Sequence, residues 1–560
     1  GAGGALLARG AAVAGLVDDT EPLFVEAARQ MVVTGDWISP QFNAQLRLDK
    51  PALLYWAVGA CLRACGGGPS CSVLAARIPS VVSAVAAATA VYLLLDRWRE
   101  AQEVTGEVRR GARVQGGPSV AHLGLAALVL SPGVLAWGQV AVADMMFTSL
   151  LTCALSAFYT AYTLRDRPGR QKASFMASSV LLALATLTKG PVAFVLGWAV
   201  ATGFLLAAGT ARRVLLHEIP WLRCALAFIA VAAPWYAMMV ATHGRLFIDT
   251  FFGYHHFDRF LVGVNWHGGR PWWFGVAATL ALAFPWSLFA PWALHNLATR
   301  GALGRKSGRA QQLPLFSAAW LLSGFLLFAA SASQLPSYYL PCVPPLVLLA
   351  VCLLDTQPAS RLRAAWSVVG VCWVAVAAAL QRAPQTLLLA SDGVTRSVGQ
   401  ALQGERRAVV LWGIAATVAA AGAALAAASA KREEASSVPL AASMAAAGAL
   451  LALNTLHPSL ALVDRFRQSP VRAAAREVAR AQRPQEPVVA VEARHLPSLV
   501  FYAQRPVAFF TTADEARRAI AGLDRTLHPT ALVLCPSGTA GFRGEVLRQG
   551  GGWNLVRVTT

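Results

Sequence analysis

Long apolar runs recur along most of the 560-residue chain, and short polar connections separate them. An α-helix needs about 20 apolar residues to cross the hydrocarbon core of a bilayer, and most runs approach that length. Their approximate bounds are 1–17, 73–96, 120–139, 144–164, 173–188, 190–208, 222–241, 273–297, 314–331, 337–354, 364–380, 408–430 and 437–456. The pattern predicts an all-α polytopic membrane protein with about 13 transmembrane helices.

Two parts of the chain depart from this pattern. Segment 18–72 is too long for a simple connection, and it predicts an outer loop with an amphipathic helix over 21–33. After residue 457, charges return to ordinary density and short apolar runs alternate with helical pieces. We therefore predict a transmembrane domain over 1–456 and a small soluble α/β domain over 457–560 on the exterior face. In that domain the predicted strands are 487–491, 500–502, 507–511 and 531–535, and the predicted helices are 471–482 and 513–521.

The charge distribution argues against a nucleic-acid partner. The chain is 56% hydrophobic and 14% charged, and its formal net charge is +20, which by itself is typical of proteins that neutralise phosphates. The excess Lys and Arg, however, lie in short connections such as 97–113, 165–172 and 300–309. This is the pattern of cytoplasmic loops, whose counter-charges are the anionic headgroups of membrane lipids. We predict membrane lipids as partners and no nucleic acid.

Acidic residues gather on the opposite, outer face. Asp18, Asp19 and Glu21 follow the first apolar run, where a positioned carboxylate can take a proton from an acceptor nucleophile. The same residues also make a good helix N-terminus, so capping is the alternative role. Asp144 begins a later span at this face, and a charge is costly there, which indicates function.

Basic, aromatic and histidine residues on the outer face suggest an anion site beside a metal site. The candidates to bind a phosphate group are Lys50, Lys189, Arg259, Arg270, Gln334, Tyr338 and Tyr339. The alternatives are a snorkelling lysine, an exposed ion pair and interfacial aromatic anchors. The candidate ligands for a divalent metal of unknown identity are Asp49, His255 and His256.

The nine cysteines add little. Paired CxxC spacing is absent from the sequence, which argues against a structural zinc site. A disulfide between Cys65 and Cys71 fits the spacing if the outer face is oxidising.

Motifs along the whole chain resemble a known family of membrane enzymes. They lie at 21–31, 35–37, 48–56, 188–191, 255–260, 284–287 and 337–341. In this order they resemble the type C glycosyltransferase family of bacterial aminoarabinose transferases and protein mannosyltransferase-like enzymes.

The resemblance implies a type C glycosyltransferase fold and an inverting transfer from a polyprenyl-phosphate-linked sugar donor. It implies a lipid, glycan or protein acceptor at the outer face. The family's catalytic acid corresponds to Asp18 or Asp19, because its Asp-Glu pair lines up with Thr20 and Glu21. The family's Glu-Lys-Pro is Asp49, Lys50 and Pro51 here, which implies a metal at Asp49 and one histidine of the 255–256 pair, and Lys50 near the donor phosphate. The plasma (inner) membrane is the expected location, with an organelle membrane as the alternative.

A multi-pass transporter or a lipid flippase is the alternative function. A transporter predicts broken helices related by an internal repeat, with polar residues near the middle of the membrane. The sequence shows no such repeat, and its unusual polar residues gather at one face. The pattern therefore favours an enzyme.

Overall fold

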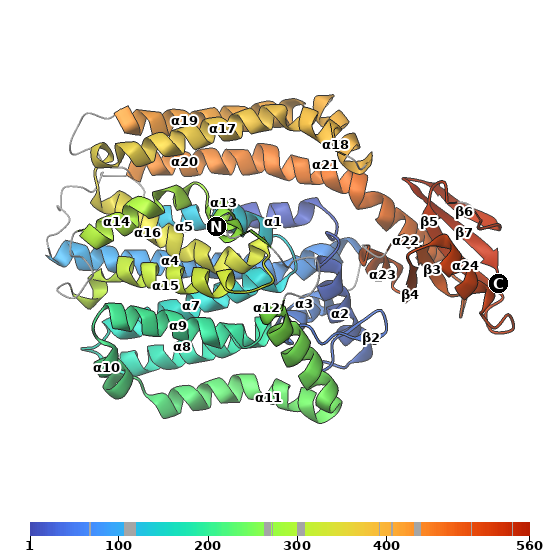
Figure 1. Cartoon of the computed structure of the whole chain (residues 1–560), viewed down its shortest axis with the longest axis horizontal. Coiled ribbons are helices and arrows are strands. Elements are labelled where there is room, and N and C mark those ends of the chain that lie inside the picture. The colour runs from blue at the N-terminus through green and yellow to red at the C-terminus, as the bar shows by residue number, and fades with distance from the viewer. Residues whose placement is uncertain are drawn as a thin grey trace.

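The computed structural model describes residues 1–66, 69–105, 119–262, 270–271, 273–299, 308–390, 393–404, 407–429, 438–493, 496–539 and 541–560. Long helices run side by side in a bundle, and a small domain with a β-sheet lies at one end (Figure 1). The outer-loop helices α2 and α3 lie at that same end of the bundle.

Helices make up almost all of the chain before residue 468. Those of the first half are α1 (Ala2–Val13), α2 (Glu21–Thr34), α3 (Leu53–Ala64), α4 (Pro69–Thr105), α5 (Val120–Val129), α6 (Pro132–Trp137), α7 (Ala143–Thr163), α8 (Pro168–Lys189), α9 (Val192–Ala207), α10 (Ala211–Arg213), η2 (Val214–Glu218), α11 (Trp221–Phe247), η3 (Ile248–Asp258) and α12 (Arg259–Leu261). Those that follow are α13 (Phe274–Leu282), η4 (Trp286–Phe289), α14 (Ala290–Thr299), η5 (Arg309–Gln311), α15 (Leu313–Ala329), η6 (Pro336–Cys342), α16 (Val343–Thr356), η7 (Ala359–Leu362), α17 (Arg363–Leu388), α18 (Gly393–Gln403), α19 (Arg407–Ser429), α20 (Val438–Leu451), η8 (Ala452–Leu456) and α21 (His457–Arg467).

Within the described residues, 7 helices are long and apolar enough to cross a membrane. They are Val73–Val104, Ala143–Thr163, Trp221–Leu261, Pro336–Thr356, Ala359–Leu388, Val409–Ser429 and Val438–Arg467. The pair Phe274–Leu282 and Trp286–Thr299, bent by 114°, raises the number to 8 if it is one broken span. The predicted all-α polytopic class is confirmed, whereas the count of thirteen crossings is not, because several apolar helices are shorter than a span.

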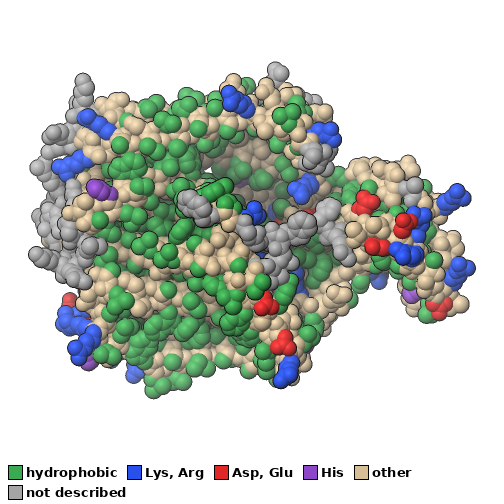
Figure 2. All heavy atoms as spheres, viewed as in Figure 1, with side chains coloured by type: hydrophobic (Ala, Val, Ile, Leu, Met, Phe, Trp, Pro, Cys, Tyr) green, Lys and Arg blue, Asp and Glu red, His purple; other side chains and the backbone are tan. Residues whose placement is uncertain are grey.

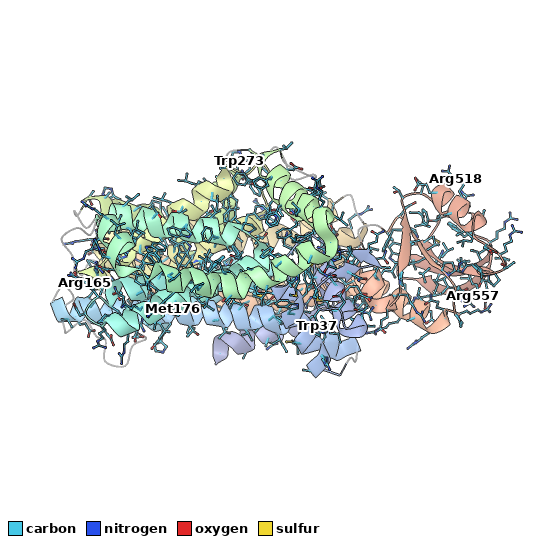
Figure 3. All side chains as sticks on the ribbon, turned by 90° about the horizontal axis from the view of Figure 1, so that it is seen from below. Trp37, Arg165, Met176, Trp273, Arg518 and Arg557 are labelled. Atoms are coloured by element: carbon cyan, nitrogen blue, oxygen red, sulfur yellow. The ribbon has the colours of Figure 1, made fainter. Side chains whose placement is uncertain are left out.

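The surface of the bundle agrees with a membrane protein. Hydrophobic side chains cover its sides, and Lys and Arg side chains gather toward its two ends and on the C-terminal domain (Figure 2). Seen from below, Arg165 of a basic connection lies at one end of the bundle, and Trp37 of the outer loop lies toward the other (Figure 3). Proteins place such basic connections on the cytoplasmic side, so the Trp37 end is the outer one.

The C-terminal domain contains the predicted α/β fold. Its elements are α22 (Ser469–Ala481), β3 (Val488–Val491), α23 (Ser498–Ala503), β4 (Val507–Phe510), α24 (Ala513–Ala521), β5 (Thr530–Pro536), β6 (Glu545–Gly550) and β7 (Trp553–Thr559). The sheet has the order β4-β3-β5-β7-β6, with β3 parallel to β4 and β5, and β7 antiparallel to β5 and β6. The strand predicted over 500–502 is wrong, because this stretch is helix α23; a short apolar run does not distinguish the two.

The outer loop and the C-terminal domain share one hydrophobic core. Buried residues of α2 and α3 pack in a single cluster with buried residues of α22, α23 and the sheet, including Phe24, Tyr55, Val471 and Leu499. The predicted boundary at 456/457 falls inside the continuous apolar helix Val438–Arg467, so the helix that crosses the bundle also leads directly into this domain. The domain is thereby held against the outer end of the bundle.

Candidate active site at the outer end of the bundle

Three predicted phosphate ligands from distant parts of the chain meet around Tyr338. Lys189 ends α8, and its Nζ lies 5.1 Å from the centre of the Tyr338 ring, while the Arg259 guanidinium at the start of α12 lies 5.9 Å from it. Burial lowers the pKa of Lys50 to about 8; Asp49 opposes this change, and the charges of Arg259 and Lys189 add to it. We call Lys50, Lys189, Arg259 and Tyr338 the cation cluster.

Asp144 belongs to the same place. Its Oδ1 accepts a hydrogen bond from Lys189 Nζ at 2.7 Å, and the ring of Phe147, one turn along α7, lies 5.1 Å from that Nζ. Asp144 is in the first turn of α7 and Lys189 in the last turn of α8, so each charge also lies at the helix end that stabilises it. Asp144 thus holds and orients Lys189, and its predicted functional importance stays a prediction.

Asp49 is held by two residues that sequence reasoning missed. Arg47 Nη2 donates to Asp49 Oδ2 at 2.7 Å, and the Tyr55 hydroxyl lies 3.3 Å from Oδ1. Burial alone would raise the pKa of Asp49, but the charges of Arg47, Lys50 and His255 outweigh it and hold the pKa below its ordinary range. Lys50 donates to the Asp49 carbonyl oxygen at 2.9 Å. The signal for Arg47 was available, because it precedes Asp49 by two positions in a short polar motif.

The predicted metal ligands only partly come together. Asp49 and His255 interact electrostatically, whereas His256 Nδ1 lies 2.5 Å from the carbonyl oxygen of Phe251. Within the described residues, no group of three or more His, Cys, Asp or Glu side chains is arranged to hold a metal ion. Arg47 and Tyr55 each donate one hydrogen bond to Asp49, one to each oxygen, and each oxygen keeps a second lone pair. We derive no chemical step through a metal.

Gly190 allows His256 to approach the end of α8. Its φ of 93° lies in the region that favours glycine, and a Cβ at this position would lie 2.3 Å from His256 Nε2. Any larger residue would therefore push η3 away from Lys189. The Lys-Gly-Pro motif fixes both the cation and the close packing beside it.

The other predicted phosphate ligands lie against different groups. The Arg270 guanidinium is exposed and lies 5.1 Å from the centre of the Phe274 ring. Tyr339 is fully buried, and its hydroxyl donates to Gln334 Oε1 at 2.8 Å. These contacts do not include the cation cluster, and we propose that Gln334 and Tyr339 stabilise the turn before α16.

Glu21 does not have the geometry of a general base. Its side chain is 1% exposed, and Arg77 Nε and Nη2 each donate to it at 2.7 Å. The backbone N–H groups of Val17 and Ala141 fill the remaining positions, each at 2.7 Å. Both oxygens are engaged, so we correct the predicted catalytic role and propose that Glu21 holds the fold of segment 14–21. Arg77, its partner, was missed because it lies 56 positions away in a span.

Asp18 and Asp19 are adjacent but face different surroundings. Ser498 of α23 donates to Asp18 twice, through its N–H at 2.9 Å and its hydroxyl at 2.6 Å. Asp19 is exposed and lines a cavity of about 480 Å³ between the outer loop and the C-terminal domain. This cavity does not include the cation cluster. The first turn of α2 connects the two places, because Leu23 lines the cavity and Phe24 packs under Arg47 at 5.1 Å.

The stability of the docked domain is expected to depend on pH through Asp18. Burial raises the pKa of Asp18 to about 6, although the bonds from Ser498 oppose this. A carboxyl with a raised pKa contributes stability below its unfolded pKa and loses it as pH rises through the folded one. We therefore expect the free energy of unfolding of the full chain to fall by at most about 3 kcal/mol between pH 4 and 7, and its Tm to fall with it. Asp18→Asn should flatten this dependence in thermal melts, and an unchanged slope would contradict the assignment.

Cys65 is disulfide-bonded. The side chain of Cys71, its predicted partner, lies outside the described residues.

Comparison with known proteins places this geometry in context. Residues 110–237 match the family described as dolichyl-phosphate-mannose-protein mannosyltransferase. The undecaprenyl phosphate-alpha-4-amino-4-deoxy-L-arabinose arabinosyl transferase of Pseudomonas aeruginosa (strain LESB58) is 30% identical over 342 residues, which are 60% of this chain and 55% of the relative. The equivalent enzyme of Edwardsiella ictaluri is 27% identical over 335 residues, which are 59% and 54% of the two chains. The matched region thus spans about half the length of these curated relatives.

The fold is shared over nearly the whole chain. The crystal structure of ArnT from Cupriavidus metallidurans bound to undecaprenyl phosphate has a TM-score of 0.76 and 19% sequence identity, and the match covers 99% of this chain and 96% of that one. The apo crystal structure of the same protein has a TM-score of 0.72. The chain therefore has the fold of ArnT from Cupriavidus metallidurans, and the fold that the motif resemblance predicted is confirmed.

Proposed function

We propose that this protein is an integral membrane glycosyltransferase that moves a sugar from a polyprenyl-phosphate donor to an acceptor at the outer face of the plasma (inner) membrane. The observation that carries the proposal is the cation cluster at the outer end of the bundle, in which Lys189 and Arg259 lie over the Tyr338 ring. The charges of both influence the pKa of Lys50. The relatives' names support the same reaction class. The proposed acceptor is a lipid, a glycan or a protein.

The cation cluster suits the leaving phosphate of a lipid-linked sugar. Charge grows on the phosphate oxygens as the bond to the sugar breaks, and preorganised cations stabilise that charge most in a site that excludes water. Burial disfavours the charged form of Lys50, which lowers its pKa to about 8. A bound phosphate would relieve this cost, so binding and charge stabilisation act in the same direction.

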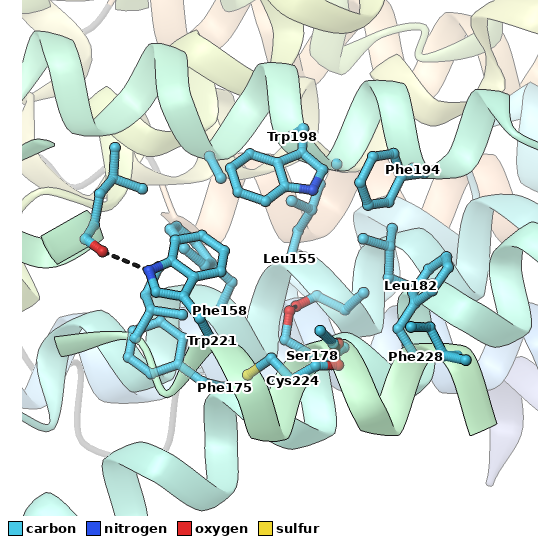
Figure 4. A pocket seen from close by; sticks show the side chains of 18 residues that line it. Leu155, Phe158, Phe175, Ser178, Leu182, Phe194, Trp198, Trp221, Cys224 and Phe228 are labelled. Carbon is cyan, nitrogen blue, oxygen red and sulfur yellow. Dashed lines mark hydrogen bonds between the residues drawn. The ribbon is translucent and has the colours of Figure 1, made fainter. Parts of the chain in front are cut away.

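An apolar cavity lies along the helix that carries Lys189. It has a volume of about 400 Å³ and lies among α7, α8, α9 and α11 (Figure 4). Its lining is almost wholly apolar and includes Phe175, Leu182, Trp198 and Trp221. The hydroxyls of Ser178 and Ser179 are turned to backbone carbonyl oxygens of neighbouring helices.

The distance from this cavity to the cation cluster suits a prenyl chain. Phe175 and Leu182 precede Lys189 on α8 by 14 and 7 positions, which correspond to about 10–20 Å along the helix axis. A donor whose phosphate binds Lys189 could therefore lay its tail into the cavity. A flippase or transporter would also need an anion site, but the cavity described above has an almost wholly apolar lining and gives no polar path.

The proposed reaction is a single displacement at the anomeric carbon. An acceptor hydroxyl or amine attacks that carbon, a bond forms between them, and the bond from the carbon to the phosphate oxygen breaks. The departing phosphate takes the electron pair and is stabilised by Lys50, Lys189 and Arg259. The acceptor proton passes to a carboxylate, for which we propose Asp19, because Asp18 is occupied by Ser498. Asp19 lines a separate cavity, so this role requires donor and acceptor to meet across the first turn of α2, where Leu23 lines that cavity and Phe24 packs under Arg47.

Single replacements of the two aspartates test this proposal. We expect Asp19→Asn to lower the rate of sugar transfer from a polyprenyl-phosphate sugar by about 10²–10⁴-fold, because the general base is lost. Asp18→Asn should lower it less than about tenfold. Binding of undecaprenyl phosphate should be unchanged in both variants, and transfer is followed by mass spectrometry of the lipid products. Full transfer activity in both variants would remove the assignment, and absence of donor binding by the wild-type protein would remove the proposed function.

A further inference from the structure

The cavity beside Asp19 is a composite of two parts of the chain. The outer loop and the C-terminal domain each supply one wall, and the residues that line it are Asp19, Leu23, Phe42, Asn43, Gln45, Pro497, Val507, Ala508 and Phe509. The cavity lies outside the candidate membrane spans. A ligand in it would therefore contact the acid proposed as general base and the C-terminal domain at once.

One wall of the cavity is the edge of a β-sheet. The strand β4 ends the sheet order β4-β3-β5-β7-β6, and its other side pairs with β3. At the first residue of β4, the side-chain amide of Asn43 donates to the Val507 carbonyl oxygen at 2.9 Å and accepts from the Val507 N–H at 2.8 Å. Asn43 thus makes the pair of bonds that a peptide group of a neighbouring strand would make.

The hairpin that presents Asn43 is built for this contact. The short strands β1 (Gln41–Phe42) and β2 (Gln45–Leu46) pair with Phe42 opposite Gln45, so Asn43 and Ala44 form a two-residue turn. Both have positive φ, 53° and 61°, as a type I′ turn requires. This conformation is unfavourable for alanine, so the surrounding contacts must hold the turn in place.

The rest of the β4 edge continues into the cavity. The Phe510 carbonyl oxygen accepts from the Glu492 N–H on the β3 side at 2.9 Å, while Val507 bonds outward to Asn43. Because alternate residues of an edge strand turn their peptide groups to opposite sides, Phe509 presents its N–H and C=O outward, away from β3. Such an edge can pair with an added strand.

The charge of the cavity restricts its occupant. Of the described residues that line it, Asp19 is the one charged side chain, and Asn43 and Gln45 are the polar ones. An anionic headgroup would meet a carboxylate without a cation beside it in this lining, which is unfavourable. A neutral or cationic chain with amide groups, in contrast, finds hydrogen-bond partners on the strand edge and on the two amide side chains.

We propose that this cavity binds an extended peptide segment of a protein acceptor, which adds to the edge of β4 beyond Asn43 and brings a hydroxyl side chain to Asp19. The inference rests on the proposed function and selects the protein among the three acceptor classes. The peptide backbone supplies the affinity, and the residue opposite Asp19 is the one that receives the sugar.

Peptide binding to the full chain in lipid nanodiscs tests this inference. The probe is a labelled, end-blocked peptide of alternating threonine and valine, compared with the same peptide N-methylated at every second residue. N-methylation removes N–H donors that an added strand needs. We expect the unmodified peptide to bind at least about tenfold more tightly than the methylated one. Equal binding of the two peptides, or no binding of either, would overturn the inference.

A matched pair of variants examines the strand edge directly. Phe509→Pro removes an outward N–H, which edge strands tolerate, together with a ring that packs against the shared core. Its Tm should therefore be close to that of Phe509→Ala, while its peptide binding falls at least about tenfold. Phe509→Ala keeps that N–H and should retain most of the binding. Wild-type affinity in Phe509→Pro would overturn the inference.

The donor measurement separates this inference from the proposed function. If the wild-type protein binds undecaprenyl phosphate and glycosylates a lipid or glycan acceptor equally well with and without Phe509→Pro, while no peptide binds, the protein acceptor is wrong and the glycosyltransferase stands. If the donor itself does not bind, the proposed function is wrong as well.

Discussion

Replacement of Lys189 by alanine is expected to lower sugar transfer by about 10²–10³-fold, the effect of removing one preorganised charge partner from a transition state. Two consequences add up in this variant. The positive charge 5.1 Å from the Tyr338 ring disappears, and the Asp144 carboxylate, which lies 2.7 Å from Lys189 Nζ, loses its ion-pair partner. A negative charge would then face the donor phosphate. Both the affinity for undecaprenyl phosphate and the transfer rate should fall.

A double variant distinguishes this account from a simple loss of packing. Asp144→Asn combined with Lys189→Ala removes both charges, so donor affinity should recover in part relative to Lys189→Ala alone. Arg165→Ala removes an exposed cation at the opposite end of the bundle and serves as the matched control. Donor affinity and transfer rate are measured for each variant. A double variant no better than the single one would argue against electrostatic coupling of Asp144 and Lys189 at the phosphate.

The second large effect is expected at Arg77, on protein stability. This side chain is 2% exposed, and besides Glu21 it donates to the carbonyl oxygens of Ala11, Ala14 and Gly15 at 2.7–2.9 Å. Arg77→Ala would leave the buried Glu21 carboxylate without its counter-charge, and such a loss costs about 3–5 kcal/mol. We expect a large drop in Tm and in the yield of folded protein, measured by thermal melts and by size-exclusion chromatography.

Two further variants define the cause of that loss. Arg77→Lys should rescue little, because an ammonium group cannot make the two parallel bonds to Glu21 and three further bonds at once. Arg77→Met with Glu21→Gln should be more stable than Arg77→Ala, since no unpaired charge remains buried. If Arg77→Ala melted like the wild-type protein, the proposed structural role of Glu21 would be wrong.

The members of the cation cluster could be singled out in the sequence because they are polar residues in apolar surroundings, and their role as phosphate ligands stays a prediction. Lys189 lies between two apolar runs, and Lys50 lies in a short polar motif. A charged residue is costly in such surroundings, so its presence alone indicates a functional role. The partner of a buried group is harder to predict. The sequence alone suggests a solvated or catalytic role for Glu21, whereas the fold pairs it with Arg77, 56 positions away. Residue spacing cannot predict a contact across so long a separation.

The C-terminal domain shows a second limit of sequence reasoning. The helix over 513–521 was predicted with its observed bounds, because its capping Thr512 and Glu515 and its amphipathic pattern agree. The inner strand β7 was missed, and so was the edge strand β6, which is largely exposed and lacks an apolar alternation. Edge strands of this kind are defined by their neighbours in the sheet more than by their own residues.

The shared apolar cluster that runs from Leu16 through α2 and α3 into α22 and α23 has a thermodynamic consequence. Segments that bury the same side chains open and close together, so the first 66 residues and the last 92 should form one cooperative unit, although the whole bundle separates them along the chain. In amide hydrogen exchange, the helix carrying Phe24 and the helix carrying Leu499 should then become labelled at matching rates. The two ends of the polypeptide would then unfold together, as one unit at the outer end of the bundle.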